Sequence, residues 1–180
     1  MNKKTIYIIV AVLVVIIIIA GAAAYILMNN NGGGGTNATP TPAPTSVPTV
    51  VGASTLQINV NETSSAGTVT YMFSAKNMNT TTLVVRMDIL GGSAGNYTYI
   101  VDTSAQKASS NINNGATWTS DDWPTDYAMV ITPFNNYVTQ LADNWNGSDL
   151  TYTYTASTGT ILIYNICPNP TLPTSLFATS

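Results

Sequence analysis

The fold class is decided by residues 55–76, TLQINVNETSSAGTVTYMFSAK, in which apolar side chains recur at every second position. The positions that alternate with mostly polar neighbours are Leu56, Ile58, Val60, Val69, Tyr71, Phe73 and Ala75. A period of two is that of a strand with one buried face, because successive side chains of a strand point to opposite sides. The stretch therefore predicts two half-buried strands, and its loop length suits an antiparallel hairpin.

The same period continues through much of the chain. We expect further strands around residues 83–89, 97–101, 106–112, 116–119, 150–154 and 161–166. GGSAG at 91–95 and Asn114-Gly115 supply turn signals between them. Residues 161–166 are apolar on both faces, which predicts a strand that is central or covered on both sides. The pattern is that of an antiparallel sheet of about eight strands.

One segment has the period of a helix instead. Thr132-Pro133 provides an N-cap followed by proline at the first helical position, and Asn146-Gly147 ends the segment. The apolar residues at helical spacing are Phe134, Tyr137, Val138, Leu141 and Trp145. We therefore predict a helix over residues 133–145 that packs on the sheet. The tail that follows the last strand contains three prolines, and Leu172, Leu176 and Phe177 predict that it packs back on the domain.

Residues 6–28, IYIIVAVLVVIIIIAGAAAYILM, contain no charge and no proline, which predicts a single membrane-spanning helix. Lys3 and Lys4 precede it, so the positive-inside rule keeps the N-terminus in the cytoplasm and places the rest of the chain outside. The small residues at 20–24 leave a cleaved signal peptide as the alternative. An uncleaved signal anchor over residues 1–28 fits better, because apolar residues continue past any such site.

Residues 29–52 predict a stalk between the anchor and a domain over residues 53–180. NNNGGGG at 29–35 is typical of flexible coil, and TNATPTPAPTSVPTV at 36–50 alternates Thr or Ser with Pro. This composition favours extended polyproline II and resembles O-glycosylated stalks, with plain disorder as the alternative. Either structure would act as a spacer.

Composition excludes several classes of function. Beyond residue 28 there are three basic and eight acidic residues, a net charge of −5, which argues against nucleic-acid binding. The chain has no histidine, and its one cysteine, Cys167, therefore lacks an activating partner. We expect Cys167 to be a buried packing residue. We identify no catalytic residue, metal ligand or cofactor, and we expect a non-enzymatic protein.

Asp121, Asp122 and Asp126 are the one group of acidic residues close enough in sequence to suggest calcium. Their spacing matches no calcium-loop pattern, and Trp123-Pro124 interrupts them. We therefore expect a solvated loop here and no metal site.

The N-x-S/T pattern, with x not proline, predicts sites for N-glycosylation in turns, strand ends and the stalk. It occurs at Asn37, Asn61, Asn79, Asn96 and Asn146. We expect two or more to be modified if the host has the pathway. The anchor, the stalk and these sites together resemble archaeal surface proteins.

The order of elements from residue 55 onward is similar to that of lipoprotein-carrier-like domains, the LolA and LppX group. The resemblance rests on residues 97–102, the Asn114-Gly115 hairpin with Trp118, and the ending formed by residues 163–166 with Asn169, Pro170, Leu172, Pro173, Leu176 and Phe177. It implies a curved sheet capped by helices over an apolar hollow for acyl chains. On that resemblance, the ligand would be lined by Tyr71, Phe73, Val85, Met87 and Tyr99 on the concave side and by Tyr137, Leu141 and Trp145 on the lid.

Two functions remain as hypotheses. The first is a non-enzymatic, single-pass cell-surface protein that displays a β-rich domain on a stalk, for binding or for envelope structure. The second is a carrier or sensor that holds a lipid or another apolar ligand between sheet and helix. The expected partners are the membrane itself and either an envelope protein or an apolar ligand.

Overall fold

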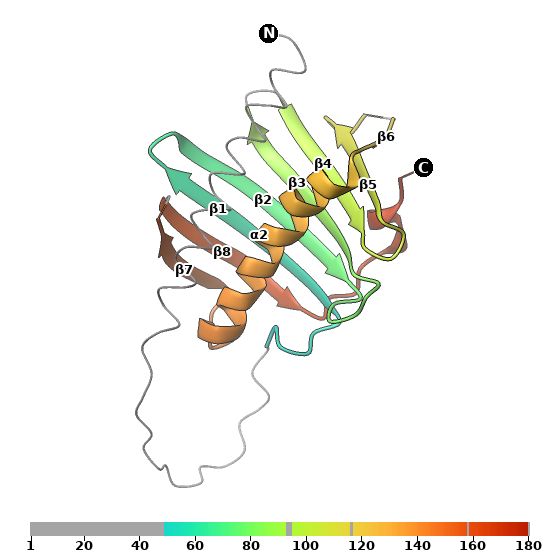
Figure 1. The fold of residues 1–180 in the computed structure, drawn as a ribbon. Helices are drawn as coiled ribbons and strands as arrows, with labels where there is room; N and C mark the ends of the chain where they lie inside the picture. Colours follow the sequence, from blue (N-terminus) through green and yellow to red (C-terminus); the bar gives the residue numbers. More distant parts are fainter. Residues whose placement is uncertain (1–48, 93–94, 116, 158, 180) are drawn as a thin grey trace, which may run out of the picture.

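The computed structural model describes residues 49–92, 95–115, 117–157 and 159–179, which form one antiparallel sheet with one α-helix (Figure 1). The strands are β1 (Thr55–Ser64), β2 (Gly67–Lys76), β3 (Val84–Gly92), β4 (Gly95–Asp102), β5 (Lys107–Ile112), β6 (Thr119–Ser120), β7 (Thr151–Ala156) and β8 (Gly159–Pro168). The helix is α2 (Trp123–Asn144), and a short 3₁₀ helix, η1 (Thr174–Phe177), follows β8. The prediction of a mainly β domain with about eight strands and one helix is confirmed.

The strand order is β6-β5-β4-β3-β2-β1-β8-β7. The first six strands are therefore a simple meander, in which each strand pairs with the next along the chain. The hairpin of β7 and β8 then joins the sheet beside β1, at the side opposite β6. The chain must cross the whole sheet to reach that side, and α2 makes the crossing.

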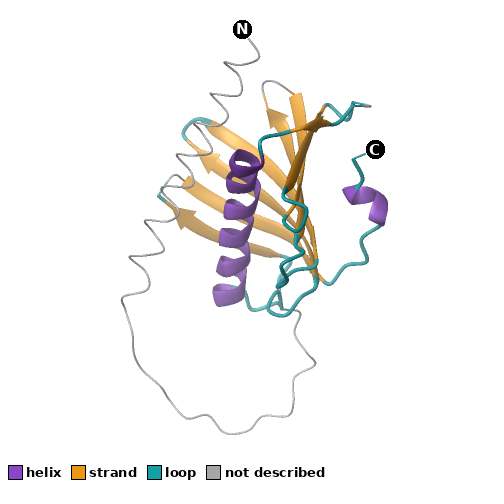
Figure 2. Cartoon of the chain, turned by 45° about the vertical axis from the view of Figure 1, so that its right-hand side comes forward, coloured by secondary structure: helices purple, strands orange, loops and turns teal. Residues whose placement is uncertain are grey.

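The length of α2 matches this task. Its 22 residues span about 33 Å at 1.5 Å per residue. Eight strands spaced about 4.8 Å apart give a sheet about 34 Å wide. Figure 2 shows the helix on one side of the curved sheet and η1 on the other. The sheet therefore has a face that carries the helix and an outer face that carries the C-terminal segment.

The predicted start of the helix is wrong by ten residues. The helix begins at Trp123 after an N-cap at Asp122, whose side chain accepts a hydrogen bond from the backbone N–H of Thr125. Pro124 occupies the first turn, where its missing N–H costs nothing. Pro133, which we interpreted as the first helical residue, lies inside the helix and deprives the Met129 carbonyl of its usual donor. The predicted end at Trp145 agrees with the structure, since Trp145 is the C-cap.

A β-bulge in β8 makes the prediction for Cys167 wrong. Between the pairs Asn59↔Tyr164 and Gln57↔Cys167, β1 advances two residues while β8 advances three. Asn165 takes the extra position with a φ of 52°. The bulge shifts the alternation by one residue, so Ile166 is buried and Cys167 is exposed.

The turn predicted at Asn114-Gly115 is also placed differently. Positive φ angles occur at Asn113 (56°) and Asn114 (53°), directly after β5. The following strand, β6, is only two residues long and begins at Thr119. The side chain of Asn111 donates hydrogen bonds to the backbone carbonyls of Gly115 and Thr117, at 2.6 and 3.0 Å, and holds this connection against β5.

The C-terminal segment packs back on the domain, as its apolar residues predicted. Leu172, Leu176 and Phe177 are half-buried, and η1 lies against the outer face at β3. Arg86 donates from Nη1 to the Leu176 carbonyl at 3.0 Å. This segment, residues 169–179, is called the C-terminal strap below.

The predicted membrane anchor and most of the stalk lie outside the described residues. Within the described ranges, none of the helices combines the length and apolar character needed to cross a bilayer. Val50 is 2% exposed and belongs to the core, so the folded part begins before the predicted boundary at residue 53.

Candidate functional site

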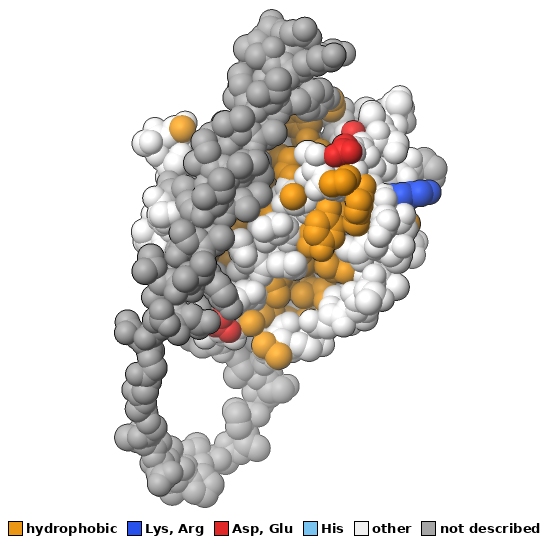
Figure 3. Space-filling model, in the orientation of Figure 1, with side chains coloured by type: hydrophobic (Ala, Val, Ile, Leu, Met, Phe, Trp, Pro, Cys, Tyr) orange, Lys and Arg blue, Asp and Glu red, His pale blue; other side chains and the backbone are white. Residues whose placement is uncertain are grey.

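The residues that the family resemblance assigned to a ligand hollow lie together between α2 and the sheet. The sheet residues Tyr71, Phe73, Val85, Met87 and Tyr99 are all buried, as are Tyr137 and Leu141 of the helix. Trp145 is half-buried at the end of α2, and its indole N–H donates to the Asp149 carbonyl at 2.7 Å. Figure 3 shows further apolar side chains at the surface over α2. The structure thus brings the predicted group together.

Direct contact joins the helix to the sheet at the centre of this group. The ring of Phe73 lies 5.7 Å from the ring of Phe134 and 5.7 Å from that of Tyr137, measured between centroids. Tyr71 stacks beside Phe73 on the same strand at 6.2 Å. Such tilted and offset arrangements are the favourable ones for aromatic pairs. The helix therefore rests on the sheet here through packed rings.

A buried carboxylate, Glu62, lies at one end of the same interface. Its side chain follows Val60 in the alternation of β1 and faces α2, with the residue only 8% exposed. The Tyr137 hydroxyl donates to Glu62 Oε1 at 2.5 Å, which ties the helix to the sheet. Glu62 Oε2 is buried and has no hydrogen-bond partner within the described chain. Sequence reasoning missed Glu62, although its position in phase with Val60 was a signal.

Burial controls the electrostatics of this group. It raises the pKa of Glu62, and the neighbouring phenols of Tyr137 and Tyr71 only partly oppose that shift. The pKa values of Tyr71, Tyr137 and Tyr154 are raised as well, first by burial and then by the charge of Glu62. The three phenols therefore remain protonated, and that of Tyr137 donates to Glu62. We call Glu62, Tyr71, Tyr137 and Tyr154 the carboxylate–tyrosine cluster.

A second acidic group lies at the start of α2, where we had predicted a solvated loop. That prediction is wrong for Asp126, which is 7% exposed in the first turn of the helix. Burial raises the pKa of Asp126 to about 7, and the nearby Asp121 and Asp122 add to the shift. One carboxylate oxygen each of Asp121 and Asp126 is buried without a partner within the described residues. A carboxyl group that holds its proton near neutral pH satisfies this arrangement better than two charged ones.

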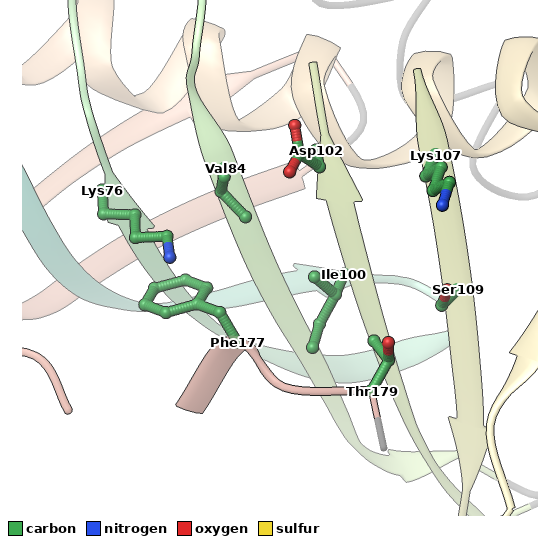
Figure 4. Close-up of a pocket in the computed structure, with 8 residues that line it drawn as sticks. All are labelled: Lys76, Val84, Ile100, Asp102, Lys107, Ser109, Phe177 and Thr179. Carbon is green, nitrogen blue, oxygen red and sulfur yellow. The ribbon is translucent and has the colours of Figure 1, made fainter. Parts of the chain in front are cut away.

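The outer face carries a small hollow beneath the C-terminal strap (Figure 4). It measures about 140 Å³ and is lined by Lys76, Val84, Ile100, Asp102, Lys107, Ser109, Phe177 and Thr179. Lys76 Nζ lies 4.6 Å from the centre of the Phe177 ring, within cation–π range. This volume is well below the roughly 300 Å³ at which ordinary small-molecule pockets begin.

Four of the five predicted glycosylation sites lie in the described part of the chain, and Asn37 lies outside it. Asn79, Asn96 and Asn146 are exposed in turns or at a strand end. Asn61 is half-buried within β1, and its side-chain oxygen accepts from the Thr70 hydroxyl at 2.9 Å. Access to Asn61 is therefore the poorest of the four.

Comparisons with family models, curated proteins and solved structures give no match to this chain. The resemblance to lipoprotein-carrier-like domains therefore stays a prediction. Within the described residues, no group of three or more His, Cys, Asp or Glu is placed to hold a metal ion. The chemistry that the described residues offer is hydrogen bonding and proton binding at buried carboxyl groups, together with apolar packing.

Proposed function

We propose that this is a non-enzymatic, single-pass cell-surface protein that displays its β-domain on a stalk, for binding or for envelope structure. The observation that carries the proposal is the packing of α2 on the sheet, where Phe73 contacts Phe134 and Tyr137. A core filled in this way favours a domain that works through its surface. The apolar segment 6–28 and the Pro/Thr-rich linker supply the anchor and the spacer.

Membrane topology is tested with impermeant protease on intact cells that express the full chain. We expect loss of a C-terminal epitope and retention of a short N-terminal fragment in the membrane, because the stalk should be the accessible cleavage site. An epitope that is protected until the cells are lysed would contradict the proposal. Mature chains that begin near residue 25 would identify the N-terminal segment as a cleaved signal peptide.

A carrier of an apolar ligand is the second candidate. The observations in its favour are the curved sheet crossed by a single helix and the unpartnered oxygen of Glu62 at their interface. A ligand with an apolar body and one hydroxyl or amine donor would suit that oxygen. In this case α2 would have to move aside as a lid, because the rings between helix and sheet are in contact.

Probe binding separates the two candidates. A fragment spanning residues 49–180 should show a cooperative thermal transition, because the described core lies within it. For the display function, an environment-sensitive apolar dye should not bind the folded fragment, and dye fluorescence should rise only on unfolding. Saturable binding below the transition, weakened in Leu141→Ala, would favour the carrier.

A further inference from the structure

The strand β7 forms one edge of the sheet and is paired along one side only. It pairs with β8 from Thr151↔Tyr164 to Ala156↔Gly159 without a register shift. The other side of β7 has no hydrogen-bond partner in the described part of the chain. Unpaired backbone N–H and C=O groups along an edge are a template for another strand.

The two edges of the sheet differ in how they are protected. The edge at β6 is only two residues long, and Asn111 holds the preceding loop across β5. The edge at β7 is six residues long, TYTYTA, and contains no charged residue, no proline and no bulge. Proteins normally block a sheet edge with a charged residue, a proline or a bulge. β7 has none of the three, which indicates an edge that receives a partner strand.

The sequence of β7 suits a second copy of itself. Residues 151–155, TYTYT, read the same in both directions about Thr153. An antiparallel pair centred on Thr153 places Tyr152 opposite Tyr154 of the second copy, and Thr151 opposite Thr155. Tyr152 and Tyr154 already stack at 5.8 Å and are half-buried, so a second pair of tyrosines would extend this aromatic row.

Charge also permits the pairing. The acidic residue nearest to β7 in sequence is Asp149, which in this register would face residue 157 of the second copy. The two Asp149 side chains would then lie about 27 Å apart, eight residues along the strands, which is beyond the screening length at physiological salt. The two strands that would pair carry no charged residue. An isologous two-fold contact of this kind closes on itself.

We propose that the protein pairs with a second copy of itself through β7, antiparallel and centred on Thr153, to give one continuous sheet across two domains. This inference deepens the proposed display function. It rests on that function in one respect, which is that both copies are anchored in the same membrane. The partner is thus a neighbouring copy on the cell surface, and the contact is main-chain hydrogen bonding with tyrosine packing.

Disulfide trapping in the full chain tests the contact. Cys167 is exposed, so it is first changed to Ser. In that background Thr153→Cys should form a disulfide dimer under mild oxidation, because two-fold partners in an antiparallel pair have Cα atoms about 4.5–5.5 Å apart. Thr119→Cys, an exposed threonine on the β6 edge, is the matched control. We expect at least about tenfold more dimer from Thr153→Cys than from Thr119→Cys.

The register is tested with a mixture of chains. Thr151→Cys and Thr155→Cys should cross-link with each other when co-expressed, and each should cross-link poorly with itself, because identical positions would be about 13 Å apart. Adding Thr153→Lys to both chains should abolish the cross-link, since two lysines would then face each other at the centre. Equal dimer from Thr119→Cys and Thr153→Cys, or no dimer from Thr153→Cys, would overturn the proposal.

The same chains are examined in detergent and in intact cells. Cross-linking of the purified chain in detergent depends on the β7 contact but not on membrane topology. A chain that cross-links in detergent while its C-terminal epitope is protease-protected in cells would contradict the display function and support the pairing. A chain with the expected topology but without the cross-link would support the display function and contradict the pairing.

Discussion

The two faces of the sheet are stabilised by different kinds of interaction. The face under α2 is almost wholly apolar, and with the helix that covers it this side includes the largest fully buried side chains, among them Phe73 of the sheet and Phe134 and Leu141 of α2. The outer face carries Lys76, Arg86 and Lys107, which are all the basic residues of the described ranges. On that face Arg86 forms a two-pronged ion pair with Asp88, and the C-terminal strap covers part of the surface.

The acidic groups of the two faces also differ in the direction in which their pKa values are shifted. Carboxyl groups buried on the helix side, Glu62 and Asp126, have raised pKa values because burial penalises their charged form. On the outer face burial also raises the pKa of Asp102, but hydrogen bonds from Ala105 and Ser104 and the charge of Lys76 outweigh it and lower the pKa. The comparison indicates that the helix face supplies the stability, whereas the outer face adds weaker, salt-sensitive contacts.

The largest expected effect is on the helix face. Leu141→Ala should lower the free energy of unfolding by about 2–5 kcal/mol, because Leu141 is 1% exposed between α2 and the sheet and its truncation leaves a cavity. Urea unfolding of the fragment 49–180 measures the loss. Met72→Ala, at a position 40% exposed on the outer side of β2, is the control and should change stability by less than about 0.5 kcal/mol. Similar losses of unfolding free energy in both variants would show that the helix face does not supply most of the stability.

The pH dependence of stability should distinguish the faces next. The pKa values of Glu62 and Asp126 are both raised in the folded state, so the stability that they contribute is present below about pH 4 and is lost as pH rises through their folded-state pKa values. For Asp126 that value is about 7. Stability should therefore fall as pH rises from about 4 to about 7. The lowered pKa of Asp102 acts only at more acid pH, where its contribution is lost as pH falls, so it does not interfere.

Two substitutions check the origin of that slope. Glu62→Gln keeps an oxygen to accept from Tyr137 but cannot ionise, and Asp126→Asn likewise removes the buried charge. The double variant should show a flatter dependence of unfolding free energy on pH and higher stability than the parent at pH 8. Asp143→Asn, at an exposed position of α2, is the matched control and should leave the slope unchanged. An unaltered slope in the double variant would assign the pH dependence to other groups.

The sequence predicted the sheet well because most strands have one apolar face, and the period of two follows directly from that burial. It failed where a local feature breaks the period. Pro133 resembles a helix start, but the helix begins ten residues earlier at Trp123, where Asp122 caps it, Pro124 fits the first turn and the added length lets it cross the sheet. The bulge at Asn165 reverses the alternation in β8, so exposure of Cys167 could not be deduced from its neighbours.

The candidate site was predicted only in part. The apolar residues under α2 follow from alternation and from the family resemblance, and the structure brings them together. Glu62 was in phase with Leu56, Ile58 and Val60, but a charged side chain at a strand end is normally interpreted as solvated. Its burial depends on Tyr137 reaching it from a helix 75 residues away in sequence, and no local pattern reports such a contact.

The smallest expected effect concerns the C-terminal strap on the outer face. Lys76 lies over the ring of Phe177, and the two can be uncoupled by a double-mutant cycle of Lys76→Met and Phe177→Ala. The coupling free energy should be about 0.5–1 kcal/mol, the range for a cation–π contact at a partly exposed site, and it should shrink at high salt.

Lys107 lines the same hollow without lying over that ring, so a cycle of Lys107→Met with Phe177→Ala is the control and should show coupling below about 0.3 kcal/mol. Coupling at Lys76 as small as at Lys107 would mean that the cation–π contact adds nothing to the apolar packing and hydrogen bonds that hold the strap. Coupling well above about 1 kcal/mol would instead show that the outer face shares in the stability that we assign to the face under α2.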